Sequence, residues 1–347
     1  MCYAMSYNKK GIITMRSFAL VTFKPEGDGQ LCRKNIIRHS FSCLKSLFIK
    51  PSWEDWVRKI ELMEDLLLYT VGLPYRVDEI SRYKSRLNKF FSQFTGENHI
   101  KCFLPRSIPD GVLMKGCIKL ETTGRLLFKS LLIYILKEIY EKKGILISEL
   151  DICIIEGENR AELREIVDLL SPMVKYITVI AEDRDTVDAD MARIYEDTGL
   201  SVRVTNELRK SLRDVDLIIN LGNLAGISPR ARINPKAVIL NYGKDEINEL
   251  SCENVILNGI KIRMGKDMSQ KIDHVLMETY GETELIETIL LFIAGLEEKV
   301  TGQYDLYKDC MDKSTVKGLS DAFVKCGCSI KEFFGRRSMI EPKDIVL

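Results

Sequence analysis

Histidine is scarce in this chain, and the short motifs of several enzyme classes are missing. The 347 residues include three histidines: His39, His99 and His274. No His-Glu-x-x-His, Gly-x-Ser-x-Gly or P-loop sequence occurs, which argues against helix-borne zinc hydrolysis, a serine nucleophile elbow and P-loop phosphate binding. His99 and His274 are open to a general-base role, but we expect surface positions for them.

The chain also carries almost no net charge and no long apolar run. Its 51 Lys and Arg residues balance 50 Asp and Glu residues to a formal charge of +1, so no global field would attract nucleic acid or an acidic membrane. The basic stretch 33–50 has the spacing of an exposed face. Segments 126–140 and 285–296 are the most apolar, but charge interrupts them within spans too short to cross a bilayer. We therefore expect no nucleic-acid partner and no membrane partner, and the oligomeric state stays open.

Cysteines occur without a second closely spaced pair. Cys326 and Cys328 form a lone Cys-x-Cys, whereas a zinc site would want another pair or nearby histidines, so we expect no metal. The other cysteines are scattered, several of them in apolar runs, at Cys2, Cys32, Cys43, Cys102, Cys117, Cys153, Cys252 and Cys310. Because no secretory leader pattern precedes them, free thiols in a reducing cytoplasm fit best.

The first third of the chain predicts a mixed domain of helices and strands. Residues 51–71 are expected to form a helix, with Ser52 as its N-cap and acidic residues in its first turn. A second, amphipathic helix is expected at 77–94. The remaining elements expected before residue 145 are strands at 16–25 and 99–105, and an extended entry into a long buried helix over 116–144.

Residues 150–222 alternate strand and helix in the rhythm of βαβ units. Near-continuous Ile, Val and Leu in the strands indicates burial on both faces, as in a parallel sheet covered by helices. Strands are expected at 150–156, 176–181, 201–204, 215–221 and 237–241, with a sixth within 254–264. The predicted fold class is α/β: a doubly wound, mostly parallel, Rossmann-like sheet with a smaller N-terminal α/β domain and C-terminal helices. The expected parts are an N-terminal domain 1–120, a connecting helix 121–144, a nucleotide-binding domain 145–300 and a C-terminal helical segment 301–347.

The turn after the first of these strands is where a dinucleotide would place its pyrophosphate. Glycines make that turn tight and let backbone amides approach, and the following helix supplies a positive N-terminus. Here the turn keeps only Gly157, while Asn159 and Glu162 stand at the second and third glycine positions. Asn159 tolerates left-handed backbone angles, and Arg160 would contact a phosphate. Nearby glutamates, however, would repel that anion by roughly 1–4 kcal/mol per pair.

Two further strand ends supply candidate cofactor contacts. Glu182 and Asp183 follow the second strand, where a carboxylate accepts hydrogen bonds from the adenosine ribose and favours NAD over NADP. The alternative is that both are ordinary polar residues at a strand end. Gly222 and Asn223 follow the fourth strand, where a glycine lets backbone lie close to a nicotinamide or another ligand. Gly222 equally suits a plain turn.

The stretch 120–242 resembles the shikimate dehydrogenase group and, more loosely, glutamyl-tRNA reductase. LETTGRLLFKSL is similar to that group's entry into its connecting helix, where a Thr-Asp-Gly segment precedes a buried helix. YITVIAED, LRKSLRDVDLIINLG and INPKAVILNYG match strands of the group in layout. The resemblance implies a two-domain protein with an interdomain cleft.

The sequence departs from this group at its catalytic positions. The group's catalytic Asp would fall on Thr123, which cannot act as an acid or base, and its Asn-x-Thr-x-Pro-x-Lys motif has no match in residues 1–119. The resemblance therefore does not carry over the shikimate reaction. Lys119, just ahead of the connecting helix, would face the cleft, and Lys119 and Thr123 are the candidate substrate-contacting residues.

Two functions follow from these observations. The first is a Rossmann-fold NAD(P)-binding protein, a divergent oxidoreductase that acts on a small molecule held between two domains. The second is a non-catalytic Rossmann-like scaffold whose degenerate cofactor site serves a binding or regulatory role. The candidate cofactor-binding residues, with NAD as the expected cofactor, are Gly157, Asn159, Arg160, Glu182, Asp183, Gly222 and Asn223. No catalytic residue is assigned.

Overall fold

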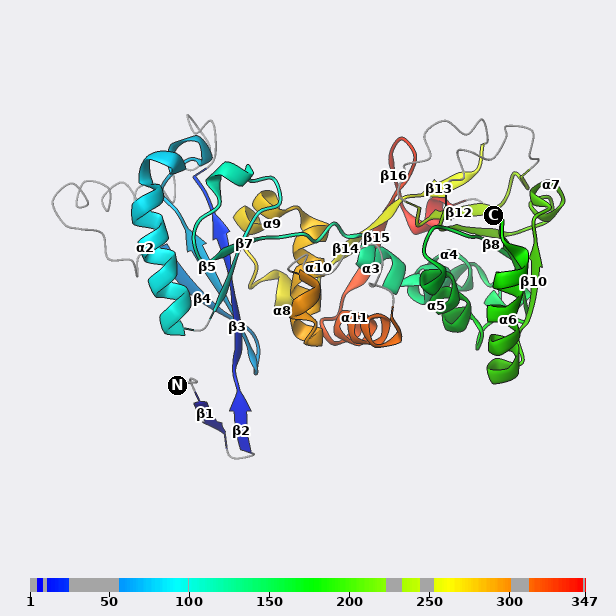
Figure 1. The fold of residues 1–347 in the computed structure, drawn as a ribbon, viewed down its shortest axis with the longest axis horizontal. Coiled ribbons are helices and arrows are strands. Elements are labelled where there is room, and N and C mark those ends of the chain that lie inside the picture. Colours follow the sequence, from blue (N-terminus) through cyan, green and yellow to red (C-terminus); the bar gives the residue numbers. More distant parts are fainter. Residues whose placement is uncertain are drawn as a thin grey trace. The chain divides into compact units, whose positions relative to one another are not determined.

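The chain folds into two compact units, whose elements are labelled in Figure 1. The computed structural model describes residues 5–8, 11–24, 56–98, 100–222, 233–243, 253–300, 312–345 and 347. Unit 1 comprises residues 1–121 and 266–281, and unit 2 comprises residues 122–265 and 282–347. The segment 145–300, expected to form one domain, is therefore divided between the units.

Unit 1 contains a mixed five-stranded sheet in the order β4-β5-β3-β6-β7. All neighbouring strands run parallel except β4, which is antiparallel to β5. The strands of this unit are β3 (Arg16–Thr22), β4 (Val57–Met63), β5 (Leu66–Gly72), β6 (Lys101–Leu104) and β7 (Cys117–Lys119), with β1 (Met5–Asn8) and β2 (Gly11–Thr14) in a separate hairpin. The strands expected at 16–25 and 99–105 are thereby confirmed.

Helix α2 (Ile80–Asn98) packs on the sheet of unit 1 and confirms the helix expected at 77–94. Its buried aromatic residues Phe90 and Phe91 share a core with the strand residues Val21 and Val71. The amphipathic spacing of the sequence was sufficient here, because one stripe of the helix meets an apolar sheet face.

The helix expected over 51–71 is wrong where the structure describes this stretch. The chain forms the β4–β5 hairpin instead, and β5 inserts beside β3 with Leu68 opposite Phe18. Both of these side chains are fully buried. Burial of aliphatic residues between strands overrode the helix propensity of the segment. Local sequence patterns cannot show this burial, because the partner strand β3 is distant in sequence.

Helix α9 (His274–Tyr280) brings a buried tyrosine hydroxyl to the backbone of unit 1, and α8 (Lys266–Ser269) precedes it. The Tyr280 hydroxyl accepts a hydrogen bond from the Val21 N–H at 2.7 Å. It also lies 2.8 Å from the Val21 carbonyl oxygen and 2.7 Å from the Phe103 carbonyl oxygen, and it can donate to either. The hydroxyl thus satisfies backbone groups of β3 and β6 where their ladder ends.

Unit 2 contains a six-stranded parallel sheet in the order β10-β9-β8-β11-β12-β13. Along the sheet, the first three strands thus stand in reverse chain order and the next three in chain order, which is the arrangement of the Rossmann dinucleotide-binding fold. The strands are β8 (Ile152–Ile155), β9 (Tyr176–Ile180), β10 (Ser201–Thr205), β11 (Leu217–Asn220), β12 (Val238–Asn241) and β13 (Val255–Leu257). The predicted fold class is confirmed.

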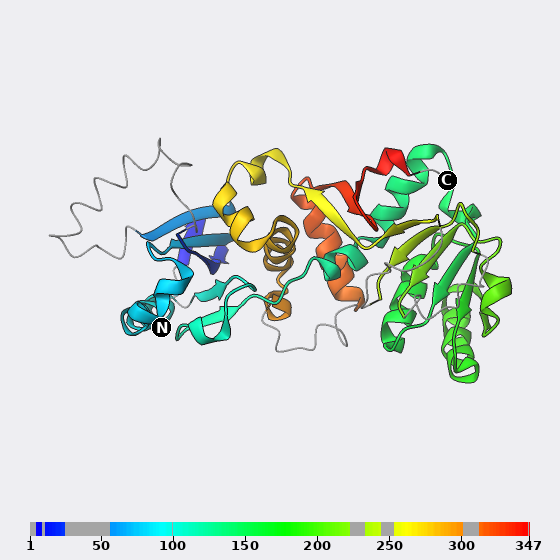
Figure 2. The same ribbon diagram turned by 90° about the horizontal axis from the view of Figure 1, so that it is seen from above.

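Helices α5 (Arg160–Leu170) and α6 (Arg184–Thr198) form the crossovers between the first three strands. Figure 2 shows them alongside the sheet, and the short helix α7 (Leu208–Ser211) follows β10. The other crossovers are partly outside the described residues. One core of the sheet is made of alternating strand residues such as Cys153, Ile218 and Ile239.

The remaining elements of unit 2 partly depart from expectation. The buried helix expected within 116–144 is two helices, α3 (Arg125–Ser130) and α4 (Leu132–Ile139), separated at Leu131. Residues 301–347 include α11 (Lys313–Lys325) but also two strands that the sequence did not predict. The first of them, β15 (Ser329–Phe334), pairs antiparallel with β14 (Gly259–Arg263), which is the second half of the expected sixth strand. The second, β16 (Met339–Ile340), pairs antiparallel with β15 and completes a three-stranded sheet.

Short 3₁₀ helices complete the described elements, at Val77–Glu79, Asp110–Val112, Glu141–Lys143, Ile147–Glu149, Glu297–Val300 and Pro342–Asp344. Within the described ranges, no helix combines the length and the apolarity needed to span a bilayer.

A buried carboxyl group joins α10 (Glu282–Ala294) to the start of α3. Glu287 accepts hydrogen bonds from the backbone N–H groups of Leu127 at 2.9 Å and Thr123 at 3.2 Å. Burial raises the pKa of Glu287 to about 7, and the backbone N–H groups of Leu127, Thr123 and Gly124 oppose that rise by stabilising the carboxylate.

Replacing Tyr280 with Phe is expected to destabilise unit 1. The Val21 N–H would be left buried without the hydroxyl acceptor, which typically costs about 1–3 kcal/mol. Urea denaturation measures the change in the free energy of unfolding. The control is Tyr83→Phe in the same unit, because the Tyr83 side chain is exposed and stacks on Tyr75 through its ring. Equal stability of the Tyr280→Phe variant and the wild type would contradict the role of the hydroxyl.

Glu287 predicts a pH dependence of unfolding. Its pKa in the folded chain lies above the ordinary value of 4.5, so between about pH 4.5 and 7 the folded chain holds a proton that the unfolded chain has released. The free energy of unfolding should therefore fall as pH rises through this window, by about 1.4 kcal/mol per unit of pKa difference. In Glu287→Gln this part of the slope should vanish, whereas exchange of the exposed Glu149 for Gln should keep it. An unchanged slope in Glu287→Gln would overturn the assignment.

Candidate functional site

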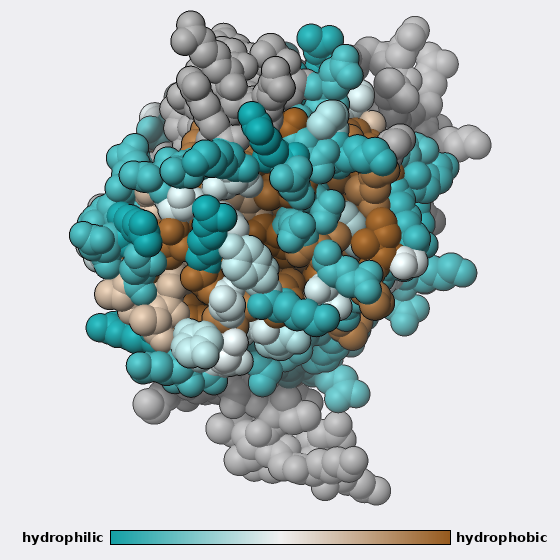
Figure 3. Space-filling view, turned by 90° about the vertical axis from the view of Figure 1, so that its right-hand side faces the viewer, coloured by the Kyte–Doolittle hydropathy of each residue, from teal (hydrophilic) through white to brown (hydrophobic). Residues whose placement is uncertain are grey.

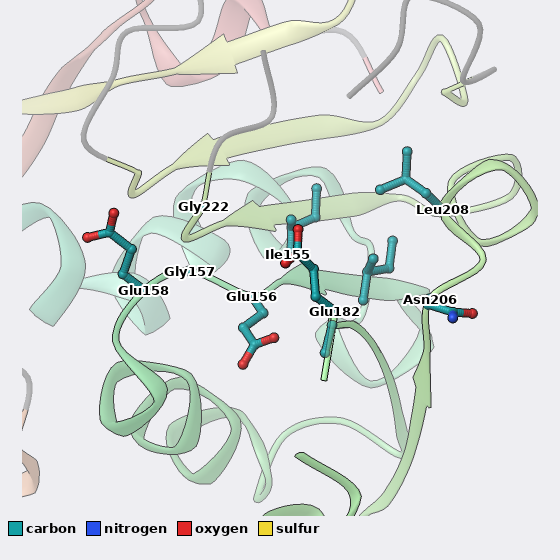
Figure 4. A pocket seen from close by; sticks show the side chains of 10 residues that line it. Ile155, Glu156, Gly157, Glu158, Glu182, Asn206, Leu208 and Gly222 are labelled. Carbon is teal, nitrogen blue, oxygen red and sulfur yellow. The ribbon is translucent and has the colours of Figure 1, made fainter. Parts of the chain in front are cut away.

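A pocket lies over the carboxyl ends of β8, β9 and β10 in unit 2 (Figure 4). Its volume is about 660 Å³. The lining comes from the last residues of β8 and β9 and from the segments that follow β8, β9, β10 and β11. It consists of Ile155, Glu156, Gly157, Glu158, Ile180, Ala181, Glu182, Asn206, Leu208 and Gly222. This edge is where open α/β sheets bind ligands.

The lining mixes an apolar floor with carboxylates. Ile155 and Ile180 are buried at the ends of their strands, whereas Glu158 and Glu182 are exposed. In Figure 4, Glu156 and Glu158 extend in different directions on either side of Gly157. Figure 3 looks onto the end of unit 2 that carries α6, α7 and β10. On this surface, hydrophilic residues lie around scattered apolar ones.

Backbone segments meet tightly where the sheet order reverses, between β8 and β11. A Cβ atom on Gly157 would lie 2.3 Å from the Leu221 carbonyl oxygen, and one on Gly222 would lie 2.3 Å from the Glu156 carbonyl oxygen. A Cβ on Gly243, after β12, would lie 2.2 Å from the Gly222 carbonyl oxygen. All three positions therefore require glycine for close approach of the loops. Gly157 and Gly222 were both predicted from the sequence as site residues, and the structure brings them together.

The N-terminus of α5 is capped by the side chain of the residue that precedes the helix, Asn159. Asn159 is the N-cap residue, and its Oδ1 accepts a hydrogen bond from the Ala161 N–H at 3.1 Å. The amide oxygen thus takes one of the backbone donors that a pyrophosphate would use at a helix N-terminus. Glu162 at the third glycine position is buried and paired with Lys129.

Arg160 lies between two carboxylates. Its guanidinium is 2.9 Å from Asp183 Oδ2 and 3.5 Å from Glu156 Oε1. Asp183 caps α6, and hydrogen bonds from the Thr186 and Arg160 side chains lower its pKa. The phosphate contact expected of Arg160 would have to compete with these pairs.

Glu156 connects the first two strand ends of the site. Burial raises the pKa of its carboxyl group, while Arg160 and the Glu182 backbone N–H stabilise the charged form. Its own N–H donates to the Ile180 carbonyl oxygen at 2.9 Å, which extends the ladder beyond β8 and β9. Glu156 therefore fixes the backbone of Glu182, whose side chain lines the pocket.

A row of asparagines, which was not predicted from the sequence, crosses the carboxyl ends of three strands. Asn220 donates to the Asn241 Oδ1 at 2.8 Å, and Asn241 donates to the Asn258 Oδ1 at 2.8 Å. The Asn220 Oδ1 is buried and has no hydrogen-bond partner among the described residues. The available signal was that Asn220 and Asn241 each end an apolar strand and Asn258 directly follows one.

The other residues expected at the site lie elsewhere. Lys119 is on β7 in unit 1, with its Nζ 2.9 Å from Asp110 Oδ1. Thr123 precedes α3 in unit 2, and its hydroxyl accepts a hydrogen bond from the Arg125 N–H at 3.3 Å. Their predicted contact with a substrate stays a prediction. Asn223 falls outside the described residues.

Of the three histidines, the structure describes His274 alone. His274 is exposed at the start of α9, as expected, with its Nδ1 3.3 Å from Glu278 Oε1. His39 and His99 lie outside the described residues.

Exchange of Gly157 for Ala is expected to destabilise unit 2. The added Cβ would force the turn away from the Leu221 carbonyl, and overpacking of this kind costs about 1–3 kcal/mol. The control is Gly96→Ala in α2, where nothing lies within 4 Å of the new Cβ and alanine favours the helix. Urea denaturation of both variants should give a lower free energy of unfolding for the first alone. A Gly157→Ala variant as stable as the wild type would contradict the close approach.

Comparisons with known proteins give similarity at the level of fold. No protein-family model matches the chain, and no curated protein matches it. Among solved structures, shikimate 5-dehydrogenase from Listeria monocytogenes, in complex with shikimate and NAD, is 12% identical with a TM-score of 0.29, over 80% of this chain and 96% of that one. Dipicolinate synthase, A chain, from Bacillus subtilis is 11% identical with a TM-score of 0.32, over 82% and 97%.

A third similar structure, Δ1-pyrroline-2-carboxylate reductase from Thermococcus litoralis in complex with NADH and L-proline, is 9% identical with a TM-score of 0.25. The match covers 33% of this chain and 35% of that one, so the chain spans about a third of that protein's length. A shikimate dehydrogenase is thus among the similar structures, as the sequence resemblance predicted, but scores this low carry no argument about activity. The fold assignment stands on the strand order: unit 2 contains a divergent Rossmann domain.

Proposed function

We propose that unit 2 binds NAD and that its pocket holds the adenosine half. The observation that carries this proposal is the position of Glu182, which follows β9 and lines a pocket over the carboxyl ends of three parallel strands. In Rossmann domains an acid at this position accepts hydrogen bonds from the ribose hydroxyls.

The rest of the lining suits a nucleoside. Ile155, Ile180 and Leu208 supply apolar contact for a base, and Asn206 supplies a donor and an acceptor. The volume of about 660 Å³ falls within the range of small-molecule pockets, roughly 300–1,000 Å³. Glu156 holds the Glu182 backbone in place and so acts as a positioning residue.

The charge of the lining favours NAD over NADP. Glu158 and Glu182 would repel a 2′-phosphate at the ribose, by about 4 kcal/mol for a charge pair 4 Å apart near a protein surface. Among the lining residues there is no Lys or Arg to offset that repulsion. A divergent oxidoreductase that transfers hydride to or from a small molecule is the activity we propose for the NAD-bound protein.

A second candidate is a non-catalytic scaffold that binds a nucleoside without the pyrophosphate. It is favoured by the self-capped turn: Asn159 already accepts the Ala161 N–H, and Arg160 is already paired with Asp183 and Glu156. A dinucleotide must displace these contacts, whereas adenosine alone need not. Relative affinity for adenosine and NAD therefore separates the two candidates.

Exchange of Glu182 for Gln tests the carrying observation. Loss of a charged acceptor costs about 1.5–3 kcal/mol, so the dissociation constant for NAD should rise about 10- to 100-fold. Fluorescence titration with NADH and competition by NAD measure it. The matched control is Glu158→Gln, an exposed carboxylate at the same pocket, for which we expect a much smaller effect.

Thermal shift with adenosine, NAD and NADP provides the remaining outcomes. A ligand at 100 times its dissociation constant stabilises by about 2.7 kcal/mol. Binding of NAD much tighter than that of adenosine supports the cofactor proposal, and equal binding supports the scaffold. No shift with any of them at millimolar concentration would contradict both.

A further inference from the structure

A second chemical feature of unit 2 lies at the junction between α11 and β15. Helix α11 ends in a Schellman motif: the Gly327 N–H donates to the Val324 carbonyl at 2.9 Å and the Cys328 N–H to the Phe323 carbonyl at 3.0 Å. Gly327 has a φ of +60°, in the left-handed region that glycine enters without strain. The motif reverses the chain between Cys326 and Cys328.

This reversal brings the two thiols together. The Cys326 and Cys328 side chains hydrogen-bond to each other, with the Cys326 thiol donating to the Cys328 sulfur. Consecutive Cα atoms are about 3.8 Å apart, so the Cα atoms of residues two apart across a bend fall within the ~7 Å limit of a disulfide. Both thiols are free in the structure.

The two thiols differ in exposure and in acidity. Cys326 is 8% exposed, and the hydrogen bond with Cys328 together with burial raises its pKa. Cys328 is half-buried, and the hydrogen bond from Cys326 lowers its pKa, assisted by the Gly265 backbone N–H and opposed by burial. Cys328, the residue with the larger exposed surface, is therefore also the one whose thiolate is stabilised.

Gly265, after β14, makes this arrangement possible. A Cβ on Gly265 would lie 2.3 Å from the Cys326 carbonyl oxygen and 3.2 Å from the Gly327 carbonyl oxygen. Only a glycine lets the two backbone segments approach so closely that the Gly265 N–H reaches the Cys328 sulfur. The dithiol thus has a built hydrogen-bond donor on a neighbouring strand end.

We propose that Cys326 and Cys328 form a redox-active dithiol that exchanges with low-molecular-weight disulfides, with Cys328 as the attacking thiol and Cys326 as the resolving thiol. The site belongs to α11, β14 and β15 and does not depend on nucleotide binding at the pocket.

The exchange proceeds in two steps. The Cys328 thiolate attacks a disulfide RSSR, which forms a Cys328–SR bond and releases RS⁻. Cys326 then loses its proton to solvent and attacks the Cys328 sulfur, which forms the Cys326–Cys328 disulfide and releases the second RS⁻. Two electrons pass from the protein dithiol to RSSR, and the two released thiolates are protonated to two RSH.

Mass spectrometry of the full chain tests the proposal. The protein is incubated with oxidised glutathione, quenched with acid, alkylated and digested. The peptide containing residues 326–328 should become lighter by two hydrogen atoms and lose both alkylation sites. A peptide that keeps both alkylation sites after incubation would overturn the proposal.

Single variants separate the two roles. Cys326→Ser should accumulate a glutathione mixed disulfide at Cys328, because the resolving thiol is absent. Cys328→Ser should form the mixed disulfide at Cys326 several-fold more slowly. Equal rates in the two variants would contradict the assigned order, and thermal melting of both variants checks that they fold.

The chain contains a matched internal control. Cys102 and Cys117 also stand side by side, in register on β6 and β7. Cys102 is fully buried, and burial raises the pKa of Cys117. This pair should therefore remain reduced and alkylatable after unfolding under conditions that oxidise Cys326 and Cys328. Oxidation of both pairs at the same rate would show that adjacency alone decides, and would overturn the proposed role of the Gly265 junction.

The hydrogen-exchange rate of the Gly265 amide tests the junction itself, because two cysteines that were merely adjacent would leave this rate unchanged on oxidation. In the reduced protein the Gly265 N–H donates to the Cys328 sulfur. Oxidation converts that sulfur into a poor acceptor, so the Gly265 amide should exchange faster in the disulfide form, whereas amides within β15 should not change. Unchanged exchange at Gly265 would contradict the coupling.

Discussion

Direct backbone contact between the loops after β8, β11 and β12 is the constraint on which unit 2 depends. Gly157, Gly222 and Gly243 each place a Cα where any side chain would collide with a neighbouring carbonyl. The contact fixes the separation of the loops at the point where strand order reverses, which is where this fold binds ligands. Arg125 at the start of α3 reinforces it by donating to the carbonyls of Tyr242, at 3.1 Å, and of Gly243.

The same contact between the loops determines where the pocket lies and which residues line it. Because the loops at the reversal point touch, the pocket lies beside them, over β8, β9 and β10. Its polar lining comes from residues that follow these three strands, and the ionisable ones are glutamates. An acidic pocket next to a capped helix N-terminus suits a neutral, hydroxyl-rich group better than a phosphate. The nucleoside portion of a cofactor is such a group, which is why the two candidate functions differ in the pyrophosphate and not in the adenosine.

Much of the architecture was predictable from the sequence, and the reason is local. The strands of unit 2 are short, near-continuous aliphatic runs that alternate with helical segments, so this alternation alone located β8 to β12. The segment expected as a helix at 51–71 failed because its leucines are buried by β3, a strand distant in sequence. β15 was missed for a similar reason: its partner β14 lies more than sixty residues earlier in the chain, and pairing decides its conformation.

The sequence predicted where the site residues lie, but it did not predict which side chains form ion pairs and hydrogen bonds with each other. Gly157, Glu182 and Gly222 stand on the pocket wall because strand ends of a parallel sheet share one edge. The pairing of Arg160 with Asp183, and the capping of Ala161 by Asn159, depend on rotamers and on the distance between β8 and β9, which no sequence pattern encodes. The asparagine row across β11, β12 and β13 likewise appears only once the strand order is known.

Because the chain returns to unit 1 after Gly265, the integrity of unit 1 depends on residues far downstream of its strands. Neither unit is a continuous stretch of sequence: the tyrosine that completes the β3 backbone is encoded far downstream, beyond the last strand of the Rossmann sheet. A premature stop between residues 265 and 280 would leave the N-terminal sheet without Tyr280, although every strand of that sheet would still be encoded. Truncation beyond the Rossmann strands would thus affect the sheet near the start of the chain as well as unit 2.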